Sequence, residues 1–117
     1  MINLKLKVSD EVMDDIMATA LEGGINYWCD KGVKVKDGDY KGAKYASDVI
    51  SKGGVLNVNG IDVDRAKLLK GIQMYIDNGN QEGIINFADR EVECDNIDAI
   101  VADVIVQFAV YGEIVYG

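Results

Sequence analysis

The sequence predicts a single α+β domain in which three to four helices pack on a small, mostly antiparallel sheet. Three observations predict it: apolar residues recur at helical spacing in several segments, shorter segments alternate apolar and polar residues, and Asn59-Gly60 separates two of the alternating segments. No linker, repeat or low-complexity run divides the sequence, so we expect one domain over residues 1–117. The order of the elements lacks the βαβ repeat of a doubly wound sheet.

The first third of the chain is expected to form a strand followed by a helix. Residues 2–6 alternate apolar and polar side chains, as in a strand with one buried face. Ser9 is the expected N-cap of a helix whose apolar positions recur through about Cys29. Gly23 and Gly24 lie inside this helix, where each costs about 1 kcal/mol relative to alanine. We expect close backbone packing there, with a ligand against the bare helix surface as the alternative.

The middle of the chain predicts a second strand, a short helix and a hairpin. Residues 33–36 alternate valine and lysine and form the expected strand. Residues 43–50 carry apolar side chains at helical spacing and predict a compact amphipathic helix. Residues 55–58 and 61–63 flank the Asn-Gly pair, whose members both tolerate positive φ, and therefore predict a hairpin.

Two further helices are expected in the last part of the chain. Asp64 is placed to cap a helix with one apolar stripe, and Asn96 is suited to cap a last helix that stops at Gly112. Between these helices, residues 80–93 lose the helical pattern and predict a loop with room for a short strand. Residues 113–117 are expected to form a short tail.

The composition excludes several classes of function. The chain has 12 basic and 20 acidic residues, so its net charge is 12 − 20 = −8, and it has no histidine. Ser-His and Cys-His catalytic systems and histidine zinc sites are therefore excluded, and we expect neither enzyme activity nor a cofactor. Only Arg65 and Arg90 carry guanidinium groups, so we expect no direct binding to nucleic acid or to anionic membranes.

The sequence carries no targeting or membrane signal that we can identify. No apolar run approaches the roughly 18 residues of a membrane span, and no export signal opens the sequence. We therefore expect the protein to be cytoplasmic. Cys29 and Cys94 are then expected to be reduced structural thiols, since they form no CxxC pair.

Residues 37–48 partly match the pattern of a calcium-binding loop. Acidic residues occupy the first, third and last positions of the pattern, but Lys41 stands where an oxygen ligand is needed. We therefore expect a polar turn and no bound metal. Carboxylate pairs such as Asp37 and Asp39 leave a carboxylate-dependent metal hydrolase as an alternative function.

Aromatic and basic residues near the glycine pair form a candidate ligand site. The candidate stacking set consists of Tyr27, Trp28, Tyr40 and Tyr45, with Lys41 and Lys44. The rings could stack on a base while the lysines meet phosphate, which would make the protein a sponge that sequesters a cyclic nucleotide signal. Ordinary packing in the core and at its rim is the alternative role for these residues.

Acidic residues are dense toward the C-terminal third and form a candidate surface for a partner protein. The acidic set consists of Asp89, Glu91, Glu93, Asp95 and Asp98, with Asp103 further along. Carboxylates spread over a small domain can imitate a phosphate backbone and occupy a basic channel in another protein. Surface charge that serves only solubility is the alternative.

Four segments of the chain resemble a group of small proteins from phages and prophages of Gram-positive bacteria. The resemblance is carried by EGGINYWC at 22–29, by parts of 39–47, by 69–72 and by the ending FAVYGEIVYG at 108–117. It implies no activity, cofactor or catalytic residue, but it implies a setting in the cytoplasm of a host bacterium. Accessory proteins of this kind often bind and block a host component.

Together these features predict a non-enzymatic binding protein that inhibits a host defence factor by protein contact. The acidic set is expected to bind a basic surface of that factor. The nucleotide sponge and the metal hydrolase are alternatives, and so is a structural accessory of the virion. The sequence leaves the oligomeric state open, and Gly23-Gly24 and the apolar residues 114–116 offer surfaces for a homo-oligomer.

Overall fold

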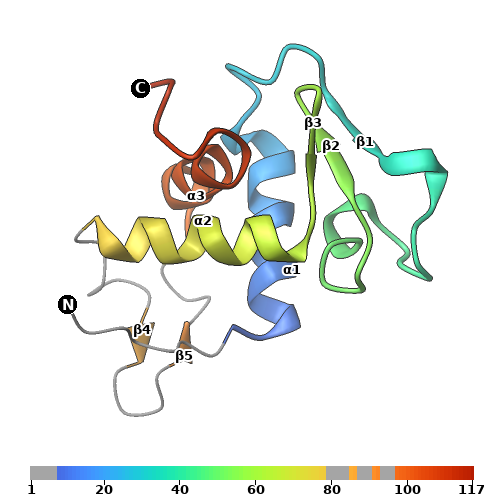
Figure 1. Ribbon diagram of the computed structural model, residues 1–117, viewed down its shortest axis with the longest axis horizontal. Helices are drawn as coiled ribbons and strands as arrows, with labels where there is room; N and C mark the ends of the chain where they lie inside the picture. Colours follow the sequence, from blue (N-terminus) through green and yellow to red (C-terminus); the bar gives the residue numbers. More distant parts are fainter. Residues whose placement is uncertain (1–7, 79–84, 87–90, 93–96) are drawn as a thin grey trace.

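The computed structural model describes residues 8–78, 85–86, 91–92 and 97–117 and confirms the α+β class (Figure 1). Within these residues, three α-helices accompany a three-stranded antiparallel sheet and a two-stranded one. In Figure 1, α1 runs vertically behind the horizontal α2, with the three-stranded sheet to the right, and the sheet contacts both α2 and α3. The strand predicted at 2–6 lies outside the described residues.

Helix α1 (Asp10–Thr19) begins where the sequence predicts. The Ser9 hydroxyl accepts a hydrogen bond of 3.2 Å from the backbone N–H of Val12, which satisfies a donor that the helix itself leaves free. The acidic residues of the first turn also suit the positive end of the helix dipole. One face of α1 is buried in the core, through Val12, Met13, Ile16 and Met17.

The prediction that this helix continues to Cys29 is wrong. A π-helical turn (Ala20–Gly24) follows α1, and Gly23 has non-helical torsions of φ 161° and ψ −17°. The close backbone packing expected at the glycines is found at Gly24, where an added Cβ would lie 3.0 Å from the carbonyl oxygen of Ala99. Nothing lies within 4 Å of a Cβ added at Gly23. The helix ends early because Gly24 must approach the start of α3.

The three-stranded sheet contains the predicted hairpin. Strand β2 (Leu56–Val58) pairs with β3 (Ile61–Val63) on one side and with β1 (Val33–Val35) on the other, both antiparallel. Asn59 and Gly60 connect β2 to β3 with φ of 52° and 87°, the left-handed values that a two-residue hairpin turn requires. The sequence prediction of this hairpin is confirmed.

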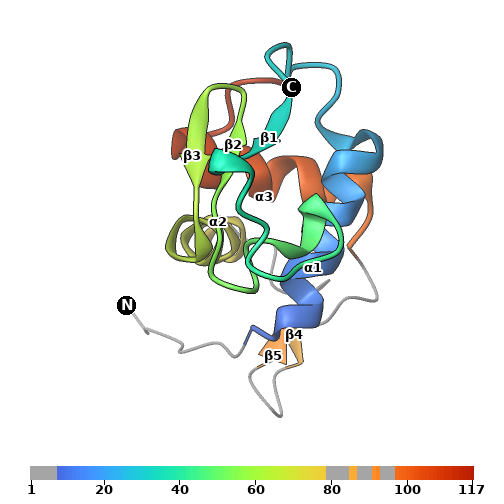
Figure 2. The same cartoon turned by 90° about the vertical axis from the view of Figure 1, so that its right-hand side faces the viewer.

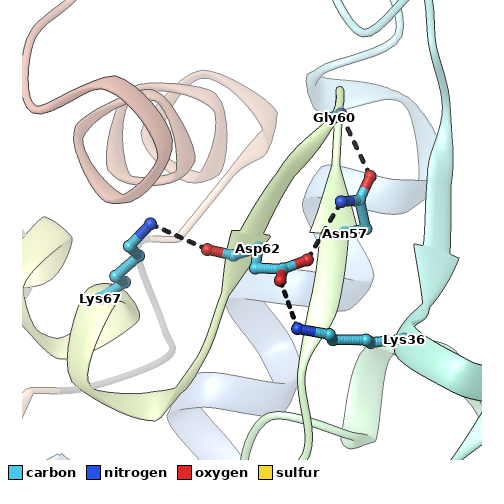
Figure 3. A network of polar contacts seen from close by, with 5 residues as sticks. All are labelled: Lys36, Asn57, Gly60, Asp62 and Lys67. Atoms are coloured by element: carbon cyan, nitrogen blue, oxygen red, sulfur yellow. Dashed lines mark hydrogen bonds and ion pairs between the residues drawn. The ribbon is translucent and has the colours of Figure 1, made fainter.

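One face of the sheet carries a polar network, and the other faces the core (Figure 3). Asp62 accepts hydrogen bonds from the Lys36 ammonium at 2.6 Å and from the Asn57 side-chain amide at 3.1 Å. The side-chain oxygen of Asn57 accepts a hydrogen bond from the backbone N–H of Gly60. The ammonium of Lys67 in α2 donates to the backbone carbonyl of Asp62. These contacts join the turn that follows β1, the hairpin and α2, so they have a structural role.

The prediction of a short helix over 43–50 is also wrong, because the backbone there is not an α-helix. The segment contains a single 3₁₀ turn (Ala46–Asp48) followed by hydrogen-bonded turns. A helix of eight residues is marginal in water, and this segment packs against α1 in a shorter form instead. Val49 and Ile50 are nevertheless fully buried, so the apolar spacing correctly predicted which side chains enter the core.

Helices α2 (Arg65–Asp77) and α3 (Ala99–Tyr111) pack closely against each other. Asp64 caps α2 as predicted, because its carboxylate accepts from the backbone N–H of Lys67 at 2.9 Å. Gly71 allows the contact: a Cβ there would lie 2.7 Å from the carbonyl oxygen of Ile105. Figure 2 views α2 nearly end-on, with the three-stranded sheet above it.

The last helix begins later than predicted. Its N-cap is Asp98, whose carboxylate accepts from the backbone N–H of Val101 at 2.9 Å, whereas Asn96 lies outside the described residues. Gly112 ends the helix as expected, with a left-handed φ of 75°. Between α2 and α3, β4 (Ile85–Asn86) pairs antiparallel with β5 (Glu91–Val92). Among the described residues, no helix combines the length and apolar character needed to cross a membrane.

Candidate functional site

The structure separates the six residues of the candidate stacking set. Tyr27, Tyr40 and Tyr45 are exposed, but Trp28 is only 2% exposed. The Trp28 ring lies parallel to the ring of Tyr116, with centroids 5.6 Å apart and an interplanar angle of 3°. Of the two roles considered for Trp28, the structure shows packing in the core, and its ring is not open to a stacking ligand.

Trp28 and Tyr27 both donate to one buried carboxylate on α3. The Tyr27 hydroxyl lies 2.5 Å from one oxygen of Asp103, and the Trp28 indole nitrogen lies 2.6 Å from the other. The side-chain amide of Gln107, one helical turn further along α3, donates to the same carboxylate at 2.9 Å. The hydrogen bond to Asp103 and burial raise the pKa of Tyr27 above its ordinary value.

This network corrects the placement of Asp103 in the acidic surface. Its side chain is 8% exposed, and three donors satisfy its charge inside the protein. A carboxylate in such a setting is stabilised by its own hydrogen bonds and is closed to a partner. We therefore assign Asp103 a structural role, which is to fix the chain after the π-helical turn against α3.

Gln107 also holds the segment that follows α3. Its carbonyl oxygen accepts from the backbone N–H groups of Val115 and Tyr116 at 2.9 and 2.8 Å, and its amide donates to the carbonyl of Tyr116 at 3.0 Å. Residues 113–117 therefore turn back above α3 (Figure 1). Ile114 and Val115 remain about half exposed, so they still offer a surface for a homo-oligomer.

Most of the acidic set lies beyond what the structure describes. Asp98 is exposed and caps α3, and Glu91 belongs to β5. Asp89, Glu93 and Asp95 lie outside the described residues. The acidic surface therefore remains a sequence prediction.

In the turn that resembles a calcium loop, Lys41 contacts the carboxylate of Asp39. Lys41 donates its backbone N–H to the Asp39 carboxylate at 3.1 Å, and its ammonium lies 3.2 Å from the other oxygen. These contacts lower the pKa of Asp39. In the parts of the chain that the structure describes, no group of three or more His, Cys, Asp or Glu residues has the arrangement of a metal site.

Two adjoining cavities lie where the π-helical turn faces the 3₁₀ turn. The first has a volume of about 440 Å³ and is lined by Ala18, Leu21, Glu22, Tyr45, Ala46 and Ser47. The second, of about 280 Å³, shares Leu21 and Ala46 with it and continues to Asn26 and Cys29. We call the pair the Leu21 groove, and the larger cavity is its Glu22 end.

The Leu21 groove contains part of the candidate stacking set. Tyr45 lines the Glu22 end, and the Lys44 ammonium lies 5.4 Å from the centroid of the Tyr45 ring, in cation–π geometry. Tyr40 and Lys41 are exposed in the preceding turn. The groove therefore combines apolar walls with one aromatic ring and one carboxylate.

Cys29 does not make the groove reactive. Burial raises the pKa of its thiol, so the side chain stays protonated at neutral pH. Only the thiolate is a good nucleophile. The raised pKa therefore makes Cys29 a weak nucleophile.

The sequence analysis missed Leu21, Glu22 and Ser47 as site residues. The available signal was the glycine pair, because two glycines within a helical pattern predict a local break. π-Helical turns are frequent at functional sites, since the extra residue displaces side chains from the regular helical face.

Comparison of the chain with protein-family models, with curated proteins and with solved structures gave no match.

Proposed function

We propose that the protein is a non-enzymatic binding protein that inhibits a bacterial host defence factor by protein contact. Its acidic C-terminal third would occupy a basic surface on that factor. The observation that carries the proposal is the net charge of −8. The carboxylate of Asp103 in the interior is bonded to Trp28 and has a structural role, so it is not part of the charge presented to a partner. Such a protein presents charge on its outside and keeps its buried polar groups for folding.

Unpaired acidic side chains support this proposal. Within the described residues, Glu11, Glu22, Asp30 and Glu113 are exposed and take part in none of the three ion pairs found there. These pairs are themselves exposed, and exposed pairs are worth only about 0–1 kcal/mol. The folded protein thus leaves part of its negative charge unpaired, which favours the approach of a cationic partner.

The test is capture of a partner from an extract of a Gram-positive bacterium by the immobilised protein at low and at high salt. We expect one captured protein to be lost as salt rises from about 0.05 to 0.3 M, because exposed charges are then screened. Charge reversal of Glu91, Glu93 and Asp95 to lysine should weaken its capture at least about tenfold.

A matched control carries the same change in net charge elsewhere. Glu11, Asp30 and Asp77 are exposed and lie outside the acidic C-terminal third, and their reversal to lysine should weaken the capture much less than reversal of Glu91, Glu93 and Asp95 does. Capture that ignores salt, or that both triple variants reduce equally, would contradict a specific role for the acidic C-terminal third.

A second candidate function is the nucleotide sponge, which the cation–π pair of Lys44 and Tyr45 favours. Calorimetry with a panel of cyclic nucleotides should then show binding that Tyr45→Ala removes. The carboxylate of Glu22 in the same cavity opposes this function, since it repels phosphate.

A further inference from the structure

The Glu22 end of the Leu21 groove has the chemistry of a site for a cationic side chain. It is lined by the apolar residues Ala18, Leu21 and Ala46 together with the acidic residue Glu22, the aromatic residue Tyr45 and Ser47. Long basic side chains combine an apolar stem with a charged head, and they bind where apolar walls end at an anion.

Lys44 shows that this ring attracts a cation. Its ammonium lies 5.4 Å from the Tyr45 ring centroid, and Lys44 forms no ion pair with Glu22. The carboxylate of Glu22 is exposed, and within the described residues no cation lies within ion-pair distance of it. The described residues thus leave the Glu22 carboxylate without an ion-pair partner.

Arginine fits these groups better than lysine does. Its planar guanidinium can stack on an aromatic ring and donate two hydrogen bonds to one carboxylate, whereas an ammonium acts as a point charge. The cavity volume of about 440 Å³ leaves room for such a side chain. A phosphate-bearing ligand would instead meet the repulsion of Glu22.

We propose that the Glu22 end of the groove binds an arginine side chain of the partner protein, with the guanidinium between Tyr45 and Glu22. This inference rests on the proposed function, because the charge of −8 selects a basic partner. It adds a specific anchor to an interaction that would otherwise depend on charge alone.

The experiment uses N-acetyl-arginine amide as the probe and follows the backbone signals of ¹⁵N-labelled protein by NMR. We expect saturable shifts confined to residues 18–22 and 44–47, with a Kd on the order of millimolar, as is usual for one side chain. The citrulline counterpart has the same shape without the charge, and it should bind at least about tenfold more weakly.

Two variants test the proposed roles. Glu22→Gln should weaken binding of the arginine probe about tenfold, whereas Glu11→Gln, an exposed control on α1, should leave it unchanged. Lys44→Gln should strengthen binding about twofold to threefold, because it removes a competing cation from the Tyr45 ring. A nucleotide site would respond to Lys44→Gln in the opposite direction, by losing affinity.

Shifts that spread over the acidic surface without saturation would overturn the inference. Equal binding of arginine and citrulline, or equal effects of the two glutamate variants, would do the same. Neither result would affect capture of the partner through the acidic C-terminal third, so failure of the groove can be distinguished from failure of the proposed function.

Discussion

Asp103 is the one carboxylate residue among the described residues that is buried, and a buried carboxylate is costly unless hydrogen bonds compensate for lost solvation. We predict that Asp103→Asn lowers the free energy of unfolding by about 2–3 kcal/mol, because the donors of Tyr27 and Trp28 would face an uncharged amide. Urea unfolding followed by Trp28 fluorescence measures the loss.

Tyr27→Phe is the reference with which the stability loss of Asp103→Asn can be compared. It removes one donor to Asp103 and leaves the other two, so its cost should be about 1 kcal/mol. If Asp103→Asn cost no more than Tyr27→Phe, the charge of Asp103 would contribute nothing to stability.

Asp14 is the second residue whose environment has a measurable consequence. One of its carboxylate oxygens is buried without a hydrogen bond, and burial raises its pKa above 3.8, although the neighbouring Ser51 side chain lowers it. The nearby charges of Asp48 and Asp10 raise the pKa further, and Lys52 lowers it. The folded state thus binds the Asp14 proton more tightly than the unfolded state does.

From this direction of shift, we predict that Asp14→Asn stabilises the protein at pH 7, by about 1 kcal/mol at most. The ionised carboxylate destabilises the folded state above its raised pKa, and this penalty fades as pH falls toward 3.8. The gain from Asp14→Asn should therefore shrink between pH 7 and pH 4 in urea unfolding. A gain that grew on acidification would contradict the assignment, and Glu11→Gln is the exposed control.

At the scale of elements, the crossing of α2 and α3 depends on Gly71. An added Cβ would lie 2.7 Å from the Ile105 carbonyl oxygen and 2.9 Å from the Ala109 backbone nitrogen, so the two helices would have to separate. We predict that Gly71→Ala destabilises the protein by about 2–3 kcal/mol, although alanine is the better helix former. Thermal unfolding measures the change.

Lys70→Ala is the matched control for that substitution. Lys70 precedes Gly71 on the same helix but is exposed, so its change to alanine should alter stability by no more than about 0.5 kcal/mol. A Gly71→Ala variant as stable as the wild type would show that the crossing can widen without cost.

The elements that could be predicted from sequence are those with local causes. The hairpin follows from two residues that accept positive φ, and the start of α2 follows from the carboxylate of Asp64 three residues before Lys67. Each of these signals lies within a few residues of the structure that it determines.

The end of α1 has a distant cause, which explains the incorrect prediction. Apolar spacing continues past Gly24, but the backbone there approaches Ala99, a residue 75 positions further along the chain. The Leu21 groove depends on the same break and on the turn at Ala46, so the sequence could predict Tyr45 and Lys44 as candidates but not their neighbour Glu22.

At the scale of the whole molecule, net charge is the property that the sequence fixes without knowledge of the fold. Eight excess negative charges occupy a body whose radius of gyration is 13.3 Å, whereas an unfolded chain of this length has one of roughly 35 Å. Folding therefore brings like charges together, and their repulsion opposes the folded state.

We predict that NaCl stabilises the protein at pH 7. At about 0.01 M salt the Debye length is roughly 30 Å, comparable with the molecular extents of 39 × 32 × 24 Å, and at about 0.1 M it falls to roughly 10 Å. Because salt weakens this repulsion, it should raise the unfolding free energy by about 1 kcal/mol, or Tm by about 4 °C, in calorimetric scans. Screening also weakens the three exposed ion pairs, but each contributes little.

A variant with reduced charge tests the cause of this salt effect. Changing Glu11 and Glu113 to lysine alters the net charge from −8 to −8 + 4 = −4. Because repulsion grows roughly as the square of the net charge, the stabilisation by salt should fall to about a quarter of the wild-type value. If both proteins responded equally, or if salt lowered the Tm of the wild type, local ion pairs rather than overall repulsion would govern the response.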